Sequence, residues 1–406
     1  MRIAELSIHG CPLKSLGTRD TGGMNVYVRE ISRQIGKRGI MVDVFTRAHN
    51  NEEPEITWLG ENARLIHLPS GEPKDIPKGE IYYHLPELIS NFRLFQEQEG
   101  IRYNLLHAHY WLSAYAAQQL RPVLGIPQIT TFHTLGAVKN RARPAEKEPE
   151  LRIATEREVA QASDRLIAFT PEESYDLVDI YGANPERVVV IPGGVDTDLF
   201  HPMDKWQARH ELGFGDGKLL LFAGRIEPIK GIDMLLRAMA FIKGVNELRL
   251  LIVGGDLDGN NEVLRLRSLA GTLGIGDRVT FWGAVEQDKM PLFYNAADIC
   301  VIPSLHESFC LVALEAMACG TPVVASRVGG LMTTIRDGET GFLVREPVPE
   351  AFAERLELIL GNEGLKQRLG SAGHTTAMEY QWSNITDKLL TVYWQMLNAR
   401  CKCKVA

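Results

Sequence analysis

The sequence predicts an α/β protein with two tandem, doubly wound domains of Rossmann-like type, and three observations lead to this fold class. Short apolar segments of strand type alternate with helical patterns of roughly 10 to 16 residues, which is typical of parallel sheets covered by helices. This alternation breaks once, at residues 193–217, and then resumes in the same order. The length of 406 residues also exceeds what a single hydrophobic core usually serves.

The strand candidates form two series on either side of that break. The first series is 2–8, 41–47, 63–69, 104–109, 127–133 and 164–170, and the second is 218–225, 248–256, 278–284, 299–304, 322–329 and 340–344. Turn-forming residues without sustained periodicity fill 193–217, so we expect the linker there. The sequence therefore predicts one domain at 1–195, a second at 196–378 and, within 379–406, an amphipathic helix that crosses back to the first domain.

Composition narrows the class of partner. The net charge is −7, from 44 basic and 51 acidic residues, and no long basic block is present, which argues against nucleic acid as a partner. The start MRIAELSIHG lacks the layout of a signal peptide, and no apolar run reaches about 18 residues, which argues against stable membrane insertion. We expect a cytoplasmic protein that binds small molecules, and a homodimer is compatible with the sequence.

Two segments, each following the first strand of a series, could hold an anion. TGG at 21–23 leads directly into a helix, where backbone N–H groups and the helix dipole favour phosphate, although a glycine turn for chain reversal is the alternative. GRIEPIKG at 224–231 places Arg225 at a strand end and Lys230 before a helix. Two cations there suit a pyrophosphate, although such residues also occur in solvated loops. No Gly-x-Gly-x-x-Gly follows the first strand, which disfavours a standard dinucleotide site.

Two glutamates accompany the most apolar helix-like run of the chain, in HESFCLVALEAMACG. Glu315 lies between Leu314 and Ala316, and Glu307 precedes the run. A buried, unpaired carboxylate costs several kcal/mol. Glu315 is therefore either a surface residue at the edge of an amphipathic helix or a carboxylate that a ligand satisfies.

Two Asp-x-Asp triplets could in principle bind a divalent metal beside a diphosphate. They are Asp196 with Asp198 and Asp256 with Asp258. Both lie among turn-forming residues, and ordinary turn chemistry explains them. The sequence therefore predicts no metal site.

Taken together, these motifs resemble the retaining glycosyltransferases of the GT-B fold, family four, over nearly the whole chain. HESFCLVALEAMACGTPVVASRVGGL is similar to the Glu-x7-Glu signature of that family, and GGMNVYV, HAHYWLSA, TTFHTLG, GRIEPIKG and FYNAADICVIPS stand in the usual order. GGMNVYV with HYWLS and FHTLG is most similar to the inositol-phosphate N-acetylglucosaminyltransferases of mycothiol synthesis and to sucrose-phosphate synthases. The resemblance implies two Rossmann-like domains that face a cleft.

The resemblance also implies a donor site for a sugar nucleotide, with no cofactor. Glu315 would accept hydrogen bonds from ribose hydroxyls, and Glu307 from hydroxyls of the transferred sugar. Arg225, Lys230 and the backbone of Gly23 would hold the diphosphate without a metal. The implied catalytic residues are His133, Arg225, Lys230 and Glu307, with His133 near the reacting carbon. The residues that would bind the donor also include Phe309, Cys310 and Leu311.

One residue departs from the family pattern. The family usually has glycine where Cys310 stands, at a point where backbone groups approach the donor. A side chain there would narrow or reshape the sugar pocket.

The acceptor side follows from the same resemblance. Positions that match the acceptor-binding residues of the mycothiol branch are Asn25, Lys78, Tyr110, Thr134 and Arg152. Cations together with hydroxyl and amide donors suit a phosphate monoester, although a solvated loop is the alternative for Lys78 and Arg152. We expect a retaining sugar transfer to a small, phosphorylated acceptor such as inositol phosphate or fructose 6-phosphate. A nucleotide-sugar epimerase and a non-catalytic sugar-nucleotide binder are the rival functions.

Overall fold

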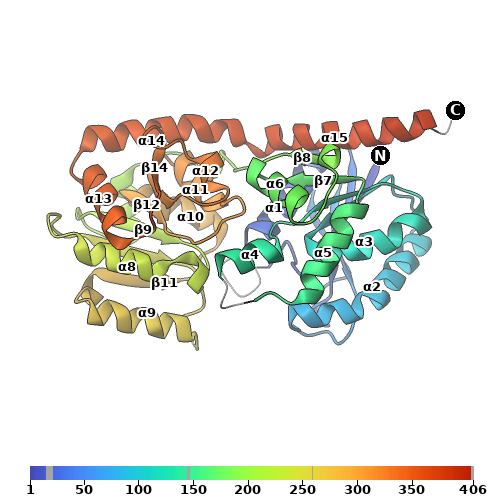
Figure 1. Cartoon of the computed structure of the whole chain (residues 1–406), viewed down its shortest axis with the longest axis horizontal. Helices are drawn as coiled ribbons and strands as arrows, with labels where there is room; N and C mark the ends of the chain where they lie inside the picture. The colour runs from blue at the N-terminus through green and yellow to red at the C-terminus, as the bar shows by residue number, and fades with distance from the viewer. Residues whose placement is uncertain (15–21, 144–146, 258, 404–406) are drawn as a thin grey trace. The chain divides into compact units, whose positions relative to one another are not determined.

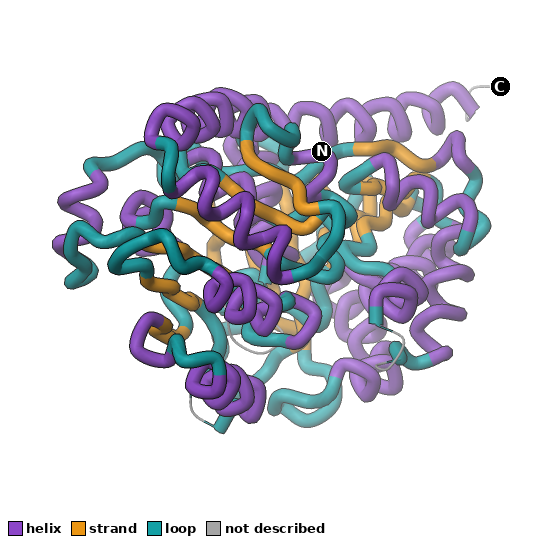
Figure 2. Tube along the Cα trace, turned by 60° about the vertical axis from the view of Figure 1, so that its left-hand side comes forward, coloured by secondary structure: helices purple, strands orange, loops and turns teal. Residues whose placement is uncertain are grey.

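The computed structural model describes residues 1–14, 22–143, 147–257 and 259–403, and the side chains of these residues up to Ala399. The chain divides into two compact units. The first contains Met1–Lys14, Gly23–Pro192 and the segment from Trp382 onward, and the second contains Gly193–Gln381. In each unit the strands lie inside and the helices lie outside (Figure 1, Figure 2).

The sheet of the first unit has the order β3-β4-β2-β1-β5-β6-β7-β8, and β3 alone pairs antiparallel among the described strands. Its strands are β1 (Arg2–Leu6), β2 (Met41–Arg47), β3 (Ile56–Gly60), β4 (Ala63–Leu68), β5 (Leu105–His109), β6 (Gln128–Thr131), β7 (Arg165–Ala168) and β8 (Val188–Val190). Its helices are α1 (Gly23–Lys37), α2 (Lys78–Gln98), α3 (Tyr110–Leu124), α4 (Gly136–Ala142), α5 (Glu150–Ala162), α6 (Pro171–Asp179) and α15 (Trp382–Cys403). Apart from Arg2, the residues of the central strands β1 and β5 are buried, as expected for a sheet covered on both faces.

The sheet of the second unit has the order β11-β10-β9-β12-β13-β14, and its pairings are parallel. Its strands are β9 (Leu219–Ala223), β10 (Arg249–Val253), β11 (Val279–Gly283), β12 (Ile299–Ile302), β13 (Val323–Ser326) and β14 (Gly341–Val344). Its helices are α7 (Lys205–Glu211), α8 (Ile232–Phe241), α9 (Asn261–Thr272), α10 (Met290–Ala296), α11 (Leu311–Ala318), α12 (Leu331–Thr334), α13 (Pro349–Leu360) and α14 (Glu363–Ala377). The two doubly wound units confirm the predicted α/β fold class.

Each predicted strand segment contains a strand of the structure, but two strands and one helix were not predicted. β3 and β8 lie at the two edges of their sheet, where side chains are partly exposed and the apolar pattern is weak. Helix α7 lies inside the segment 193–217, for which we expected no regular structure. The carboxylate of Asp204 caps it by accepting a hydrogen bond from the backbone N–H of Gln207 at 2.7 Å.

Helix α15 is part of the first unit, although it follows the second unit in sequence. It packs on α1 (Figure 1). Nε of Arg38, the residue after α1, donates to Oδ1 of Asp387 at 2.8 Å. Inside the second unit, the segments next to its two ends form a parallel bridge between Val195 and Gln381. Among the described helices, none has both the length and the apolar character needed to cross a membrane.

Candidate functional site

Each sheet has one place where the strand order reverses, and the predicted residues collect at these two places. The reversal lies between β1 and β5 in the first unit and between β9 and β12 in the second. In open α/β sheets, ligands bind at the carboxyl ends of the strands at such a switch point. Arg225 and Lys230 follow β9, Glu307 follows β12, and Tyr110 follows β5. The topology thus brings residues that are distant in sequence to two common edges.

Lys230, which is half-buried, and Glu307, which is buried, form an ion pair in the second unit. The Lys230 ammonium donates to Oε1 of Glu307 at 2.7 Å, and the Ser304 hydroxyl donates to the same oxygen at 2.7 Å. Burial by itself would raise the pKa of Glu307, but the charge of Lys230 and these two hydrogen bonds hold it below its usual value. Glu307 is therefore ionised at neutral pH.

Close contact between two loops creates this pair. Gly231 has φ of 66°, and a Cβ on it would lie 2.1 Å from the main-chain oxygen of Pro303. The backbone N–H of Leu305 also donates to the main-chain oxygen of Ile229 at 2.9 Å. Glycine at 231 is required both by its left-handed conformation and by this approach. The loop after β9 is thus fixed against the loop after β12, with Lys230 beside Glu307.

The second carboxylate of the signature, Glu315, is half-buried on α11 and has a partner within the protein. The hydroxyl of Tyr294 on α10 donates to Oε2 of Glu315 at 2.6 Å. Arg225 is partly exposed, and its Nη1 donates to Glu227 at 2.7 Å. Gly23 is exposed and is the first residue of α1. The proposed contacts of these residues with a donor remain predictions.

Phe309, Cys310 and Leu311 form the junction between the loop after β12 and α11. A Cβ on Gly193 would lie 2.7 Å from the ring of Phe309 and 3.2 Å from the side chain of Leu311, so the backbone at 193 packs directly on this junction. Cys310 itself has φ of 78° at the start of α11. The residue that departs from the family pattern therefore has the left-handed conformation that favours glycine.

Left-handed backbone conformations are concentrated at the candidate site. Among the described residues, the non-glycine positions with positive φ are Asn62, Tyr110, His133, Glu247 and Cys310. Tyr110, His133 and Cys310 were predicted site residues, with φ of 76°, 63° and 78°. Such strain persists only where the surrounding structure enforces it, and it is commonly found at functional sites.

We expect Cys310→Gly to raise the free energy of unfolding by about 1 kcal/mol, because glycine has no Cβ to strain at this φ. The measurement is urea denaturation at neutral pH, with Cys300→Ala, at a buried strand position, as the control that should lose stability. A loss of stability in Cys310→Gly would mean that packing of the thiol outweighs the backbone strain.

In the first unit, Arg152 joins two other predicted acceptor residues. Nη2 of its buried guanidinium donates to the main-chain oxygen of Thr134 at 2.9 Å and to its Oγ1 at 3.0 Å. The guanidinium also lies 4.9 Å from the ring centroid of Tyr110. Its remaining nitrogens pair with Glu148 at 2.9 Å and Glu156 at 2.7 Å. Arg152 therefore fixes Thr134 and Tyr110 in place, and the four-residue spacing of Glu148 and Glu156 on either side of it was a signal in the sequence.

The other predicted residues of this unit lie near the β1 and β5 ends. Nε2 of His133 lies 3.1 Å from Nδ1 of His109, and burial lowers the pKa of His133 to about 3, so its ring is neutral. Asn25 is buried, and its Nδ2 donates to the main-chain oxygen of Cys11 at 2.9 Å, which fixes the loop after β1. Lys78 is half-buried at the start of α2.

His9 is a candidate residue that the sequence did not single out. Its ring centroid lies 4.2 Å from that of Tyr110. Burial first, and then the positive charges of Lys78 and Arg152, lower its pKa well below the usual value, so its ring is neutral. Its Nδ1 is buried and has no hydrogen-bond partner among the described residues. The position of His9 after β1, beside the switch point, was the signal that could have identified it.

The Asp-x-Asp triplets were predicted to be turn residues. Oδ1 of Asp196 accepts hydrogen bonds from the backbone N–H groups of Asp198 and Leu199 at 3.1 and 3.2 Å, which is an Asx turn. Asp258 lies outside the described residues, so the second triplet stays a prediction. Elsewhere, the described residues that could share a metal ion are Glu5, His107 and His109 of the first unit.

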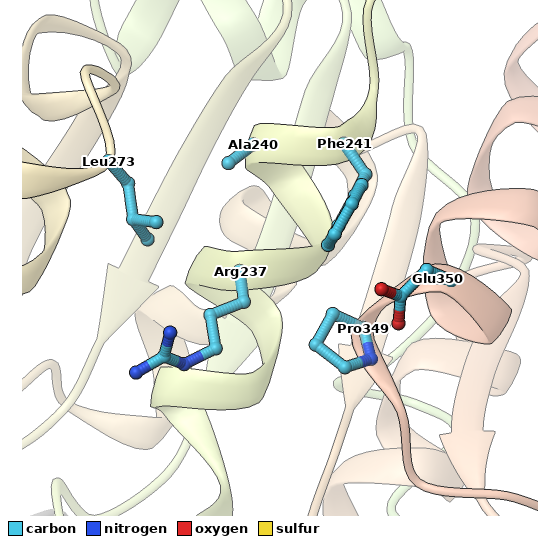
Figure 3. Close-up of a pocket in the computed structure, with 6 residues that line it drawn as sticks. All are labelled: Arg237, Ala240, Phe241, Leu273, Pro349 and Glu350. Carbon is cyan, nitrogen blue, oxygen red and sulfur yellow. The ribbon is translucent and has the colours of Figure 1, made fainter.

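A surface pocket of about 330 Å³ lies elsewhere in the second unit (Figure 3). Arg237, Ala240 and Phe241 of α8 lie in the middle of the lining, between Leu273 on one side and Pro349 and Glu350 on the other. None of these residues belongs to the predicted donor set. The donor candidates are therefore defined by the switch point and not by this pocket.

Comparison with known families divides the chain in a similar way. The family described as glycosyl transferases group 1 matches residues 204–376. The family described as glycosyltransferase family 4 matches residues 21–199. The first match contains the Lys230–Glu307 pair, and the second contains Arg152 with its partners Tyr110, Thr134, Glu148 and Glu156.

Individual relatives extend over nearly the full chain. A D-inositol 3-phosphate glycosyltransferase of Acidothermus cellulolyticus is 40% identical over 98% of this chain and 91% of its own length. The corresponding protein of Mycobacteroides abscessus is 41% identical over 97% of this chain and 88% of its own length. The structure of sucrose-phosphate synthase from Thermosynechococcus elongatus aligns with a TM-score of 0.90 and 34% identity, over 98% of this chain and 99% of that one.

Proposed function

Because the chain belongs to the group 1, family 4 glycosyltransferases of GT-B fold, we propose that it transfers a sugar, with retention of configuration, from a nucleoside diphosphate sugar to a small phosphorylated acceptor. The donor is a UDP-sugar, and the acceptor is of the inositol phosphate or fructose 6-phosphate class. The observation that carries this proposal is the Lys230–Glu307 ion pair at the switch point between β9 and β12.

The donor side combines a cation for the leaving group with a carboxylate for the sugar. Lys230 and Arg225 neutralise the diphosphate, and Glu307 accepts hydrogen bonds from sugar hydroxyls while it stays ionised through Lys230. Glu315 accepts from the ribose hydroxyls, in addition to the bond from Tyr294. A carboxylate oxygen has more than one lone pair, so a protein partner and a ligand partner are compatible.

The acceptor side is the group around His9 in the first unit. Lys78 supplies a point charge for a phosphate, and Tyr110 and Thr134 supply hydroxyl groups held by Arg152. The names of the relatives support this class of acceptor, since one acts on D-inositol 3-phosphate and the other is a sucrose-phosphate synthase.

In the proposed reaction, the acceptor hydroxyl attacks the anomeric carbon from the face of the leaving group. The bond from that carbon to the diphosphate oxygen breaks, the bond to the acceptor oxygen forms, and a diphosphate oxygen takes the acceptor proton. The cations stabilise the charge that develops on the diphosphate, so the chain's own share of catalysis is positioning and electrostatic stabilisation. No metal ion is required in this scheme.

A screen of UDP-, ADP- and GDP-sugars against inositol phosphate and fructose 6-phosphate tests the proposal, with products identified by mass and anomeric configuration by NMR. We expect an α-linked, phosphorylated product and initial rates that change by less than about twofold in excess EDTA. Loss of activity in EDTA that manganese restores would refute metal independence. Epimerised sugar nucleotide without acceptor, or donor binding without turnover, would favour the rival functions.

Lys78→Ala tests the acceptor phosphate. We expect the Michaelis constant for the acceptor to rise by roughly ten- to a hundredfold, the scale of a lost charge-assisted hydrogen bond, with little change for the donor. Lys14→Ala is the control, since this neighbouring lysine pairs with Asp75 at 2.8 Å and is not assigned to the acceptor. The unphosphorylated acceptor should lose a similar factor with the wild type and little more with Lys78→Ala. Penalties that multiply would show that Lys78 does not contact the phosphate.

A further inference from the structure

Buried polar side chains form a row on the sheet of the first unit, between β1, β5 and the helix α1. Glu5 of β1 is in register with His107 of β5, and His109 follows two residues later on the same face. All three side chains have no exposed surface. Because a buried polar group without a partner costs free energy, such a row is retained only where its contacts are organised.

A protonated Glu5 would satisfy both short contacts of the Ser32 hydroxyl on α1. The hydroxyl oxygen of Ser32 lies 2.6 Å from the main-chain oxygen of Val28 and 2.6 Å from Oε2 of Glu5. A hydroxyl donates one proton, and a carbonyl can only accept. When Ser32 donates to Val28, the second contact is made by a proton on Glu5 that is donated to Ser32. Burial favours the same state, since it raises the pKa of Glu5 to about 8.

His109 connects this neutral carboxyl group to the candidate site. Its Nε2 lies 4.0 Å from Oε2 of Glu5, and its Nδ1 lies 3.1 Å from Nε2 of His133. Within the described part of the chain, Nε2 of His109 and Oε1 of Glu5 are buried without a direct partner. This separation exceeds that of a direct hydrogen bond, so Glu5 and His109 are buried neighbours that meet by packing. Since burial keeps both imidazoles neutral, the His109–His133 contact is one hydrogen bond between a donor and an acceptor nitrogen.

A transition metal is the other occupant that this row could hold, because Glu5, His107 and His109 offer ligand atoms within 4.8 Å of one another. The ring nitrogens of His107 are already engaged, at 2.6 Å from the Tyr393 hydroxyl and 2.9 Å from Oγ1 of Thr131. Zinc would require bonds of about 2.0 to 2.2 Å to each ligand and the loss of one His107 contact. The contacts therefore favour a hydrogen-bonded row over a metal centre.

The end of the row, His133, is a residue whose conformation needs support. Its φ is 63°, and the rings of Tyr27 and Phe169 lie 5.2 Å from its ring. Arg152 holds the main-chain oxygen of the next residue, Thr134, at 2.9 Å. His109 thus fixes the ring of His133 from one direction, while Arg152 fixes the following peptide from another.

From these contacts we propose that Glu5 and His109 are positioning residues for sugar transfer, which act by holding His133 in one ring orientation and one backbone conformation. The inference rests on the proposed function, together with the position of His133 near the reacting carbon that the family resemblance implies. Glu5 orients His109, and His109 orients His133; neither touches the substrate.

Two substitutions of His109 separate its two ring nitrogens. The amide group of asparagine occupies the place of Nδ1, so His109→Asn keeps the contact with His133. The longer glutamine side chain places its amide group where Nε2 of His109 lies. His109→Gln therefore keeps a polar group next to Glu5 and loses the contact with His133. We expect kcat to fall by about tenfold or more in His109→Gln and to stay within about threefold in His109→Asn, with unchanged KM values, since small misplacements at a reacting centre are costly.

Two substitutions of Glu5 form a second pair of variants, and their kcat is measured as a function of pH. Glu5→Leu should lower kcat at every pH, and the neutral isostere Glu5→Gln should rescue it. The titratable groups that face Glu5 are Tyr27 of α1, His107 and His109 of β5, and Tyr393 of α15, and burial shifts the pKa of each so that all four are neutral between about pH 6 and 9. We therefore expect a fall in wild-type kcat above about pH 8 that is absent in Glu5→Gln.

A measurement without turnover separates this inference from the proposed function. In protein labelled with ¹⁵N-histidine, the ring shifts of His133 should report one tautomer in the wild type and in His109→Asn, and an averaged state in His109→Gln. Equal shifts in all three proteins, or kcat losses that follow the melting temperatures of the two His109 variants, would overturn the inference. One bound metal ion per chain, removed by Glu5→Gln, would replace it with a metal site. A wild type that transfers no sugar refutes the proposed function, whereas the shifts still decide the positioning contact.

Discussion

Replacing Lys230 by methionine lowers the turnover of sugar transfer by a factor on the order of 10² or more, because the diphosphate leaving group loses its half-buried cation. Methionine keeps most of the volume of the lysine stem, so packing beside Ser304 and Glu307 changes little. The measurement is kcat for the donor and acceptor pair that the screen identifies. Donor binding in the ground state should weaken less than turnover, since the leaving-group charge is greatest in the transition state.

The control for this variant is the double substitution Lys230→Met with Glu307→Gln. Lys230→Met alone leaves a buried carboxylate without its cation, 2.7 Å away, and should lower the free energy of unfolding by about 3 to 5 kcal/mol. The double variant removes both charges and should regain most of that stability without regaining turnover. Recovery of turnover together with stability would show that Lys230 serves the fold and not the reaction.

Glu5→Gln should increase the free energy of unfolding by about 3 kcal/mol at pH 7, which is the cost of keeping a proton on a carboxyl group that would otherwise ionise. Burial raises the pKa of Glu5 from 4.5 to about 8. Below about pH 4.5 the folded and unfolded chains both hold this proton. As the pH rises towards 8 the unfolded chain releases it first, so stability falls. Glutamine has no proton to release, and it can still donate to Ser32.

Urea denaturation of the wild type and Glu5→Gln at several pH values between about 5 and 8 measures this effect. The difference in stability should be small near pH 5 and should increase with pH. Glu307→Gln is the opposite control, because Lys230 lowers the pKa of Glu307, and removing that carboxylate should reduce stability at neutral pH. A Glu5→Gln gain that does not depend on pH would show that Glu5 is ionised in the folded state.

The buried strands could be predicted from the sequence because they are buried on both faces and therefore read as continuous apolar runs. β2 coincides with its predicted segment 41–47. β3 carries Trp58, which is 62% exposed, and pairs only with β4, so no apolar run marks it. An edge strand is held by hydrogen bonds to a single neighbouring strand, and the local sequence pattern does not show which segment that neighbour is.

The sequence motifs named candidate site residues, whose roles stay predictions, but they did not name the partners that these residues have in the structure. The motif that contains Glu307 and Glu315 indicated carboxylates that need hydrogen-bond partners. In the structure, a partner of Glu315 is a hydroxyl from a separate helix, 21 residues earlier in the chain, which the motif did not predict. The family pattern marked Cys310 as a replacement of glycine, and the positive φ explains why glycine is usual there. His9 has no motif of its own, because its importance comes from the ring of Tyr110 beside it.

The discontinuous first unit has a consequence for how the protein is made. Helix α15 follows the second unit in the chain, yet Tyr393 donates to or accepts from the buried His107 at 2.6 Å, and Trp382 packs at 5.7 Å from Tyr27. During synthesis these residues leave the ribosome only after the whole second unit has been made. The second unit, whose two ends are joined by the Val195–Gln381 bridge, can complete its core before that point. The first unit, most of which is synthesised first, is therefore completed after the second unit. An mRNA truncated after the codon for Gln381 would yield a folded second unit and a first unit whose sheet is not covered by α15.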